Sequence, residues 1–453
     1  MSGTTIKLSF GRIAAYGFGD FGFNLFYTGL NLYLLFYYTD VLGIAPTTAG
    51  VIFMIPVIWD AVTDPVMGSI ATRTRTRWGS YRPFILFGAP VMAVSFVGMF
   101  AAPLLLPGAA IAACLISHII FRTAYTVVSI PYTALSAAMT KDGAERSKLA
   151  GARMVCAVAG GVLTAYSTLL LAKAFGGADL AAGFVSVAIL FATITTGIMV
   201  LLFFTTSEDV AEASTRQRLS LAQSWLFLRK NNAFWLLFSA VFASALGASI
   251  ANKALVYYVT YVVGDQELVS PLLALYLLST GAAVPIWAWS AQRYSKRDVW
   301  LAGAIAGAFL QGFLLILAPT EFLPLLVLIC LSGLCNAAFI TMFWAMLPDT
   351  VEFGEWRSGF RDEGIVFGLN QLALKAASGI GVGLLGILLG QIGYVANEMQ
   401  TAETLEGLRW LSFGVPLGAA MITIATIWKY PLTNNRHRVL VKVLRRKSFA
   451  EKV

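Results

Sequence analysis

The chain is built largely from apolar stretches that are each long enough to cross a lipid bilayer as a helix. A spanning α-helix needs about 20 consecutive, mainly apolar residues, and the 453-residue sequence offers twelve such stretches. Their approximate bounds are 13–38, 47–71, 84–106, 109–138, 148–174, 181–205, 233–262, 268–291, 299–318, 323–347, 363–392 and 408–429. The sequence therefore predicts an all-α integral membrane protein with twelve transmembrane helices.

Composition supports a membrane protein and argues against a nucleic-acid-binding one. Hydrophobic residues make up 58% of the chain and charged residues 12%, whereas soluble proteins carry about 25% charged residues. The net charge of +9 comes from basic residues in short loops and in the C-terminal tail. We therefore expect a lipid bilayer and a small molecule as partners, with no nucleic acid and no obligate protein partner. No cofactor is predicted, because no cysteine pair has metal-ligand spacing flanked by histidine.

The basic residues also predict the topology. Lysine and arginine occur in every second connection and in the tail, and the loops DVLGIAPTTAG, GDQELVS, APTEFLP and NEMQTAETLEG contain neither. The positive-inside rule then places both termini in the cytoplasm of a multi-pass protein of the bacterial inner membrane. The longest polar interruption predicts a six-helix half at 1–205, a linker at 206–232, a second half at 233–430 and a basic tail at 431–453. This plan is typical of major facilitator transporters, which bind substrate near the membrane midplane between their halves.

Two aspartates inside the second predicted span are the strongest functional signal. The segment IWDAVTDPVMG (58–68) places Asp60 and Asp64 four residues apart, on one face of a helix. Charges at bilayer depth are costly, so they are usually functional. The pair needs a positive partner, which is Na⁺, a proton or a basic side chain. The alternative is an ion pair that only positions helices, and no metal is predicted beyond a possible Na⁺ at Asp60 and Asp64.

Other polar residues lie inside the predicted spans. Arg122, Thr126 and Ser129 form one stripe on the fourth span. Arg122, Arg153, Lys253 and Lys375 outnumber Asp60 and Asp64, so an anionic substrate would balance a positive cavity, although Asp20 lowers the surplus. The predicted substrate-binding residues are Asn24, Arg122, Tyr125, Ser129, Arg153, Lys253, Trp344, Asn370 and Gln371.

Several motifs, in order along nearly the whole chain, resemble one transporter family. They are YGFGDFGFN (16–24), YYTDVLG (37–43), IWDAVTDPVMG (58–68), RTRWGSYRPFIL (75–86), IPYTAL (130–135), DTVEFGEWRSGFRDEG (349–364) and LNQLALK (369–375). Together they are similar to the glycoside–pentoside–hexuronide:cation symporters, the melibiose permease-like branch of the major facilitator superfamily. The resemblance implies cation-coupled sugar import by alternating access, with no enzymatic activity.

The resemblance also implies roles for individual residues. It places the cation site at Asp60, Asp64 and Thr126, with Lys375 acting on the aspartate pair, and it makes Arg153 a sugar contact. The residues that it implies for closing the cytoplasmic side are Arg293, Asp349, Glu352 and Arg361.

Departures from the family pattern bear on the substrate. Asn24 and Ser129 stand where the family's melibiose-transporting branch has sugar-binding aspartates, and Thr63 replaces an asparagine that is associated with sodium use. Loss of two carboxylates, with Arg122 and Lys253 present, favours an acidic sugar such as a glucuronide. Whether the coupling cation is Na⁺ or H⁺ stays open at this stage.

Four alternatives are left open. The first is symport of a neutral glycoside or pentoside. A membrane prenyltransferase-like enzyme could use DAVTD and DTVEFGE as Mg²⁺-diphosphate motifs, although that class needs richer acidic motifs and fewer spans. A lysolipid carrier of the same fold would need an apolar cavity, and a sugar sensor would need a large soluble output domain. The polar and basic residues inside the predicted spans argue against a lipid carrier, and the sequence offers no large soluble output domain for a sensor.

Overall fold

The computed structural model describes residues 8–140, 142–208 and 221–450. Regular structure in this part of the chain is helical, and its extended pairing is limited to an isolated bridge between Thr76 and Gly79. The helices of the first half of the sequence are α1 (Phe10–Phe36), α2 (Pro46–Arg73), α3 (Arg82–Leu105), α4 (Ala110–Met139), α5 (Gly143–Gly176) and α6 (Leu180–Thr205). Those that follow are α7 (Leu221–Lys230), α8 (Asn232–Tyr257), α9 (Val269–Arg293), α10 (Lys296–Leu317), α11 (Phe322–Ser358), α12 (Glu363–Gln391), α13 (Ala402–Arg409), α14 (Val415–Trp428) and α15 (Asn434–Ala450).

Short π-helical and 3₁₀ turns extend or connect these helices. The π-helical turns are Tyr37–Val41 after α1, Tyr258–Val263 after α8 and Trp410–Gly414 before α14, and the 3₁₀ turns are Pro107–Ala109 and Gln266–Leu268. The predicted spans therefore coincide with helices to within a few residues at most ends, because long apolar runs fix where a bilayer-spanning helix must lie.

Eleven helical segments in the described part of the chain are long and apolar enough to cross a membrane. The first predicted span, 13–38, falls on α1, which is a 27-residue helix but is not among the eleven. Asp20, Asn24 and Asn31 lie in α1 and make it more polar than the other predicted spans. The protein is thus an all-helical, multi-pass membrane protein, and a count of twelve spans stays a prediction.

The described residues form two compact units. Unit 1 takes the residues up to 208 together with 265–277 and 382–400, and unit 2 takes 221–264, 278–381 and 401–450. The predicted linker, 206–232, contains α7, and its residues 209–220 lie outside the described residues. The predicted tail, 431–453, contains α15.

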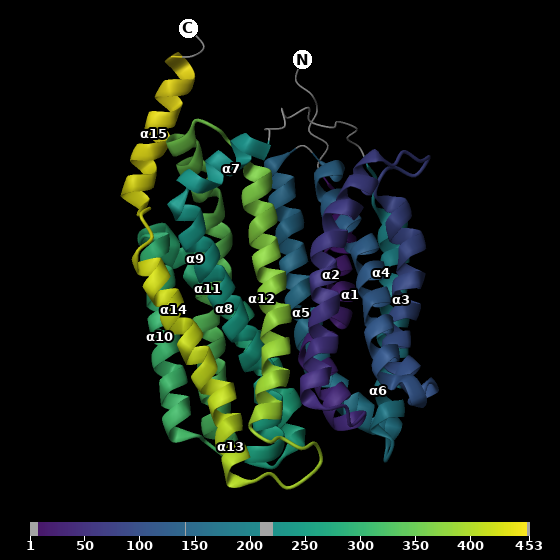
Figure 1. The fold of residues 1–453 in the computed structure, drawn as a ribbon. Helices are drawn as coiled ribbons and strands as arrows, with labels where there is room; N and C mark the ends of the chain where they lie inside the picture. The colour runs from purple at the N-terminus through teal and green to yellow at the C-terminus, as the bar shows by residue number, and fades with distance from the viewer. Residues whose placement is uncertain (1–7, 141, 209–220, 451–453) are drawn as a thin grey trace. The chain divides into compact units, whose positions relative to one another are not determined.

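Close helix packing defines the interior of unit 1 (Figure 1), where α1 lies along α5 and α3 lies against α4 and α6. Gly160 of α5 permits the first of these contacts, because a Cβ atom there would lie 2.7 Å from the carbonyl oxygen of Phe21. Backbone approach through small residues is a common way to associate helices in membranes. The close approach of α1 and α5 at Gly160 brings the polar residues of the two helices near one another.

A buried carboxylate ties the end of α1 to the segment after α12. Asp40 is 8% exposed, and its side chain accepts hydrogen bonds from Tyr394 Oη at 2.7 Å and Thr39 Oγ1 at 2.6 Å. Asn397 donates to the Asp40 backbone carbonyl at 2.7 Å. Within unit 1, residues more than 350 positions apart in sequence are therefore held together by side-chain hydrogen bonds.

Another carboxylate organises the connection between α2 and α3. Glu208, just after α6, accepts from the backbone N–H groups of Ser80, Tyr81 and Arg82 at 2.7, 2.7 and 2.9 Å. These donors lie at the N-terminus of α3, where free N–H groups and the helix dipole favour an anion. The side chain of Arg82 reaches back to the carbonyl of Phe203 at 2.6 Å, which closes the arrangement.

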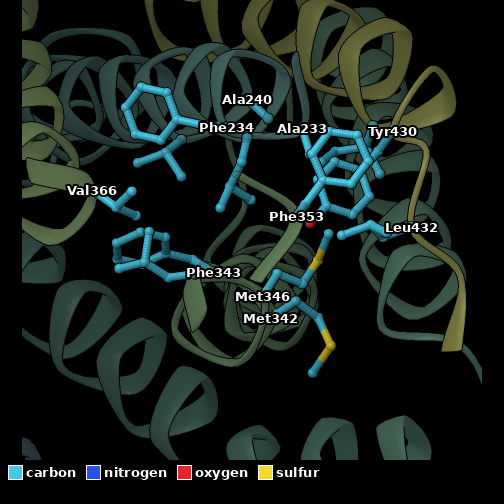
Figure 2. Packing of buried hydrophobic residues seen from close by; sticks show 14 of the residues in the cluster. Ala233, Phe234, Ala240, Met342, Phe343, Met346, Phe353, Val366, Tyr430 and Leu432 are labelled. Carbon is cyan, nitrogen blue, oxygen red and sulfur yellow. The ribbon is translucent and has the colours of Figure 1, made fainter. Parts of the chain in front are cut away.

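The core of unit 2 is a cluster of aromatic and sulfur-containing side chains (Figure 2). Phe343, Met342 and Met346 of α11 face Phe234 of α8, and Tyr430 packs beside them from the segment after α14. This packing holds α11 in place, and α11 carries the acidic residues described below.

Candidate functional site

Asp60 of α2 and Arg122 of α4 form a buried ion pair. Arg122 Nη1 lies 3.0 Å from Asp60 Oδ2, and the two side chains are 8% and 2% exposed. Asp60 lies near the middle of the candidate span Pro46–Arg73. Of the possible partners for the aspartates, the structure therefore supplies a basic side chain for Asp60.

Asp64 is held by a different residue of α4. Thr126 Oγ1 donates to Asp64 Oδ1 at 2.9 Å. Thr126 is 2% exposed, and Asp64 is partly buried. Thr63, between the two aspartates, turns its hydroxyl to the carbonyls of its own helix at Trp59 and Asp60. The i, i+4 spacing thus presents both carboxylates to α4, and one turn of α4 separates their partners.

A histidine of α4 extends the ion pair between Asp60 and Arg122. His118 is fully buried, and its Nε2 accepts from Arg122 Nε at 3.3 Å. The His118 ring packs edge-on against Phe53 of α2, with ring centroids 5.3 Å apart. Sequence reasoning missed His118. The available signal was its position one helical turn before Arg122.

Arg153 of α5 pairs with Asp20 of α1. Arg153 Nε hydrogen-bonds Asp20 Oδ2, and Nη2 lies 3.3 Å from Oδ1. The guanidinium also lies over Tyr132, 5.0 Å from the ring centroid. Tyr132 and Tyr16 exchange hydrogen bonds with each other's backbone carbonyls at 2.7 and 3.0 Å. Arg153 is therefore fixed by a carboxylate and an aromatic pair.

The remaining predicted sugar residues of unit 1 lie near these pairs on α1 and α4. Asn24 donates to the backbone carbonyl of Asp20 at 2.8 Å and accepts from Thr28 at 3.4 Å. The Tyr125 ring packs against Phe23, with centroids 5.3 Å apart. Ser129 is partly buried. Asn24 and Ser129 thus carry amide and hydroxyl groups, which suit sugar hydroxyls, while Tyr125 is part of an aromatic layer.

The predicted residues of unit 2 have separate surroundings. Lys253 of α8 is 3% exposed, and its Nζ lies 3.2 Å from Ser249 Oγ, which donates to the carbonyl of Ser378. Asn370 of α12 is fully buried and donates to the carbonyl of Val366 at 3.0 Å. Trp344 is 43% exposed. Gln371 is exposed and Lys375 is partly buried.

The predicted gate residues do not form one network. Asp349 binds Lys296 Nζ at 2.8 Å, and Glu352 binds His437 of α15. Arg361 pairs with Glu355 at 2.7 Å and with Glu363 at 2.8 Å.

The guanidinium carbon of Arg293 lies 4.1 Å from the Trp289 ring centroid, and Arg293 forms no ion pair with the residues that the structure describes. Lys296 and His437 were missed because sequence reasoning assigned the residues around them only to topology.

Comparison with known proteins identifies the family. The profile described as MFS/sugar transport protein matches residues 15–434. The chain belongs to this family. It is therefore a sugar-transporter-type membrane protein, in agreement with the predicted resemblance and the predicted absence of enzymatic activity. The prenyltransferase alternative has no support among the relatives described next, which are transporters.

Two curated members of the MFS/sugar transport family span nearly the same length. The chain is 29% identical over 439 residues to the glucuronide carrier protein homolog of Escherichia coli K12, covering 96% of this chain and 95% of that protein. It is 30% identical over 420 residues to the isoprimeverose transporter of Lactiplantibacillus pentosus, covering 91% and 87%. The names of these relatives include both an acidic and a neutral sugar.

Solved structures support the same fold. The inward-open xylose transporter XylE from E. coli matches with a TM-score of 0.65 at 14% identity, covering 94% of this chain and 96% of that one. At this identity the likeness shows the major facilitator fold alone.

Proposed function

We propose that this protein imports a sugar or glycoside by symport with Na⁺ or H⁺, through alternating access. The observation that carries this proposal is the polar contact between α2 and α4, where Asp60 and Asp64 meet Arg122 and Thr126 within spans. Ionisable groups in membrane spans are costly and mark ion and substrate pathways. The family membership supplies the transport of sugars.

The proposed coupling acts through the carboxylates of α2. A cation that reaches this pair changes its charge and thereby the interactions of Arg122 and, as predicted, of Lys375. The sugar site then gains affinity. By linkage, the bound sugar raises the affinity for the cation by the same factor. No cofactor takes part, and the coupling cation is the second transported species.

We propose an acidic sugar, of glucuronide or hexuronide type, as the substrate. Lys253 supports this choice, because it is a basic side chain buried inside a span, 3.2 Å from Ser249 Oγ, and basic residues at this depth mark substrate and ion pathways. The name of the E. coli relative points to the same class. The other proposed sugar contacts are Asn24, Arg122, Tyr125, Ser129, Arg153, Trp344, Asn370 and Gln371.

A neutral glycoside or pentoside is the second candidate, and a specific observation favours it. Arg122 and Arg153 each have a carboxylate partner, Asp60 and Asp20. The positive surplus predicted from sequence is therefore smaller than the number of basic residues indicated. The isoprimeverose transporter is a relative whose name points to a neutral sugar.

The proposed orientation keeps both termini in the cytoplasm, and Asp349, Glu352, Arg293 and Arg361 remain the proposed residues that close the cytoplasmic side. Of these, Asp349 and Glu352 gain support as a pair, because Lys296 and His437 bind them from α10 and α15.

Uptake into proteoliposomes tests the function. Purified protein is assayed with a radiolabelled glucuronide and with a neutral galactoside, each under an imposed Na⁺ gradient and, separately, a pH gradient. Accumulation of the glucuronide under one of the two gradients is expected. Preference for the galactoside would replace the acidic sugar by the neutral one. Absence of uptake under both gradients would contradict symport.

A pair of lysine variants sharpens the substrate test. Lys253→Met should lose most glucuronide uptake while any galactoside uptake changes less, because it removes the buried positive charge. Lys173→Met is the matched control, since Lys173 lies near the end of α5 and has no proposed contact with sugar.

A further inference from the structure

The ion pair of α2 and α4 bears on which cation the protein can use. Na⁺ binds through oxygen ligands, and the carboxylates of Asp60 and Asp64 supply charged oxygens on this part of α2. Arg122 Nη1 already lies 3.0 Å from Asp60 Oδ2. A sodium ion on the same carboxylate would stand next to a fixed guanidinium in a poorly solvated site, where like charges repel strongly.

Arg122 is held at this position from a second side. Its Nε donates to His118 Nε2 at 3.3 Å, and its Nη1 points to Asp60. His118 lies one turn earlier on α4, is fully buried and packs against Phe53 of α2. Because the ring nitrogen accepts a hydrogen bond from a cation, it is unprotonated in this arrangement. The guanidinium is thus fixed by two hydrogen bonds of different direction.

We infer that Arg122 serves as a built-in cation at Asp60, positioned by His118, and thereby excludes Na⁺ from the carboxylate pair of α2. This inference rests on the proposed function, since it concerns the selectivity of the proposed coupling site. Arg122 is a selectivity-determining residue in this view. His118 is a positioning residue that acts through Arg122.

The same geometry explains why Asp64 differs from Asp60. Asp64 receives the hydroxyl of Thr126 on α4 at 2.9 Å. The guanidinium, in contrast, balances the charge of Asp60. The two aspartates therefore have different partners on α4, although the sequence presents them as a symmetrical pair.

Binding of radioactive Na⁺ to the purified full-length protein tests the inference without any sugar. Equilibrium binding of ²²Na⁺ is measured at one fixed pH and constant ionic strength, with choline replacing Na⁺. Wild-type protein should show no saturable binding. Arg122→Gln, which removes the charge and keeps a polar side chain, should bind Na⁺ saturably, with a dissociation constant at least about tenfold below the highest Na⁺ concentration at which wild type shows no saturation, a difference of about 1.4 kcal/mol.

Matched variants separate selectivity from structure. Arg153→Gln removes an arginine of another candidate span, which pairs with Asp20 instead, and should gain no Na⁺ binding. His118→Leu should gain partial Na⁺ binding because it releases Arg122 on one side. His118→Gln retains an acceptor oxygen and should restore the exclusion. A merely structural role for His118 would lower stability without changing Na⁺ affinity.

Each outcome decides the matter. Saturable Na⁺ binding by the wild-type protein overturns the inference, whether or not Arg122→Gln folds. A folded Arg122→Gln protein that gains no Na⁺ binding also overturns it. Absence of sugar uptake under both gradients, with Na⁺ binding gained in Arg122→Gln, would contradict the proposed function and leave the inference standing.

Discussion

Two acidic pairs on helices of different units have different surroundings. Asp60 and Asp64 of α2 lie within a candidate span, where Arg122 and Asp60 are 8% and 2% exposed. Asp349 and Glu352 lie toward the C-terminal end of α11, where the side chains of Lys296 and Asp349 are 29% and 10% exposed and that of Glu352 is 27% exposed. The same types of residue thus form a fully buried ion pair in one place and, in the other, a cluster in which Asp349 is buried while Lys296, Glu352 and His437 are partly exposed.

The difference teaches that burial decides what each contact is worth. Removing one member of a buried ion pair leaves an uncompensated charge, which costs about 3–5 kcal/mol. Exposed pairs are typically worth about 0.2–1 kcal/mol, because water and salt screen them. We therefore expect the α2 pair to contribute most to stability and coupling. We expect the contacts of the α11 cluster to break with a smaller loss of free energy when a helix moves.

The largest effect is expected for Asp60→Asn. This change leaves the Arg122 charge buried and should lower the free energy of unfolding by about 3–5 kcal/mol. Unfolding by sodium dodecyl sulfate from a mild detergent provides the measurement. Asp60→Asn/Arg122→Gln should recover most of the loss, and a single variant within about 1 kcal/mol of wild type would remove the contrast between the two regions.

Thr126→Val should have the next largest effect, mainly on transport. It deletes the hydroxyl that binds Asp64, and a hydrogen bond to a charged group is worth about 1.5–3 kcal/mol. The cation concentration for half-maximal uptake should therefore change by about tenfold or more. Thr72→Val is the control, because the Thr72 hydroxyl donates to the carbonyls of Gly68 and Ser69 in its own helix. Equal behaviour of both variants would show that the Asp64 contact plays no part in coupling.

Lys296→Met should cost less than the loss of Asp60, about 1–2 kcal/mol, because Lys296 is 29% exposed although Asp349 is buried. A double-mutant cycle with Asp349→Asn in the same unfolding assay measures the pairwise term. A coupling energy as large as that between Asp60 and Arg122 would mean that exposure does not distinguish the two regions.

Arg361→Gln should have the smallest effect, within about 0.5 kcal/mol of wild type. Arg361 bridges Glu355 and Glu363 with a side chain that is 49% exposed. Raising the salt concentration should erase even this difference, since salt screens exposed pairs. A loss that persists in high salt would place Arg361 in a more demanding role.

Hydropathy predicted most of the fold because span length is set by bilayer thickness. It was less informative for α1, where Asp20 and Asn24 interrupt the apolar run. Spacing predicted that Asp60 and Asp64 share a face, but it carries no information on how α2 and α4 are aligned. The pairing of Asp60 with Arg122 and of Asp64 with Thr126 therefore needed the structure.

The residues missed by sequence reasoning share a physical cause. His118 is a lone histidine in an apolar run, which is usual for a packed side chain, and its meaning comes from the hydrogen bond with Arg122. Lys296 and His437 belong to a basic loop and a basic tail, where charge alone explains their presence. Only contacts across helices separate them from their neighbours.

The hydrogen bonds between Glu208 and the start of α3 have a consequence for biogenesis. The three N–H groups that it receives belong to Ser80, Tyr81 and Arg82, and 128 residues separate Ser80 from Glu208. During synthesis, the connection after the second span leaves the ribosome long before its partner does. This turn therefore acquires its final hydrogen bonds only after the sixth helix has been synthesised. Glu208, the last of these residues to be translated, completes the turn at Ser80, the first of them.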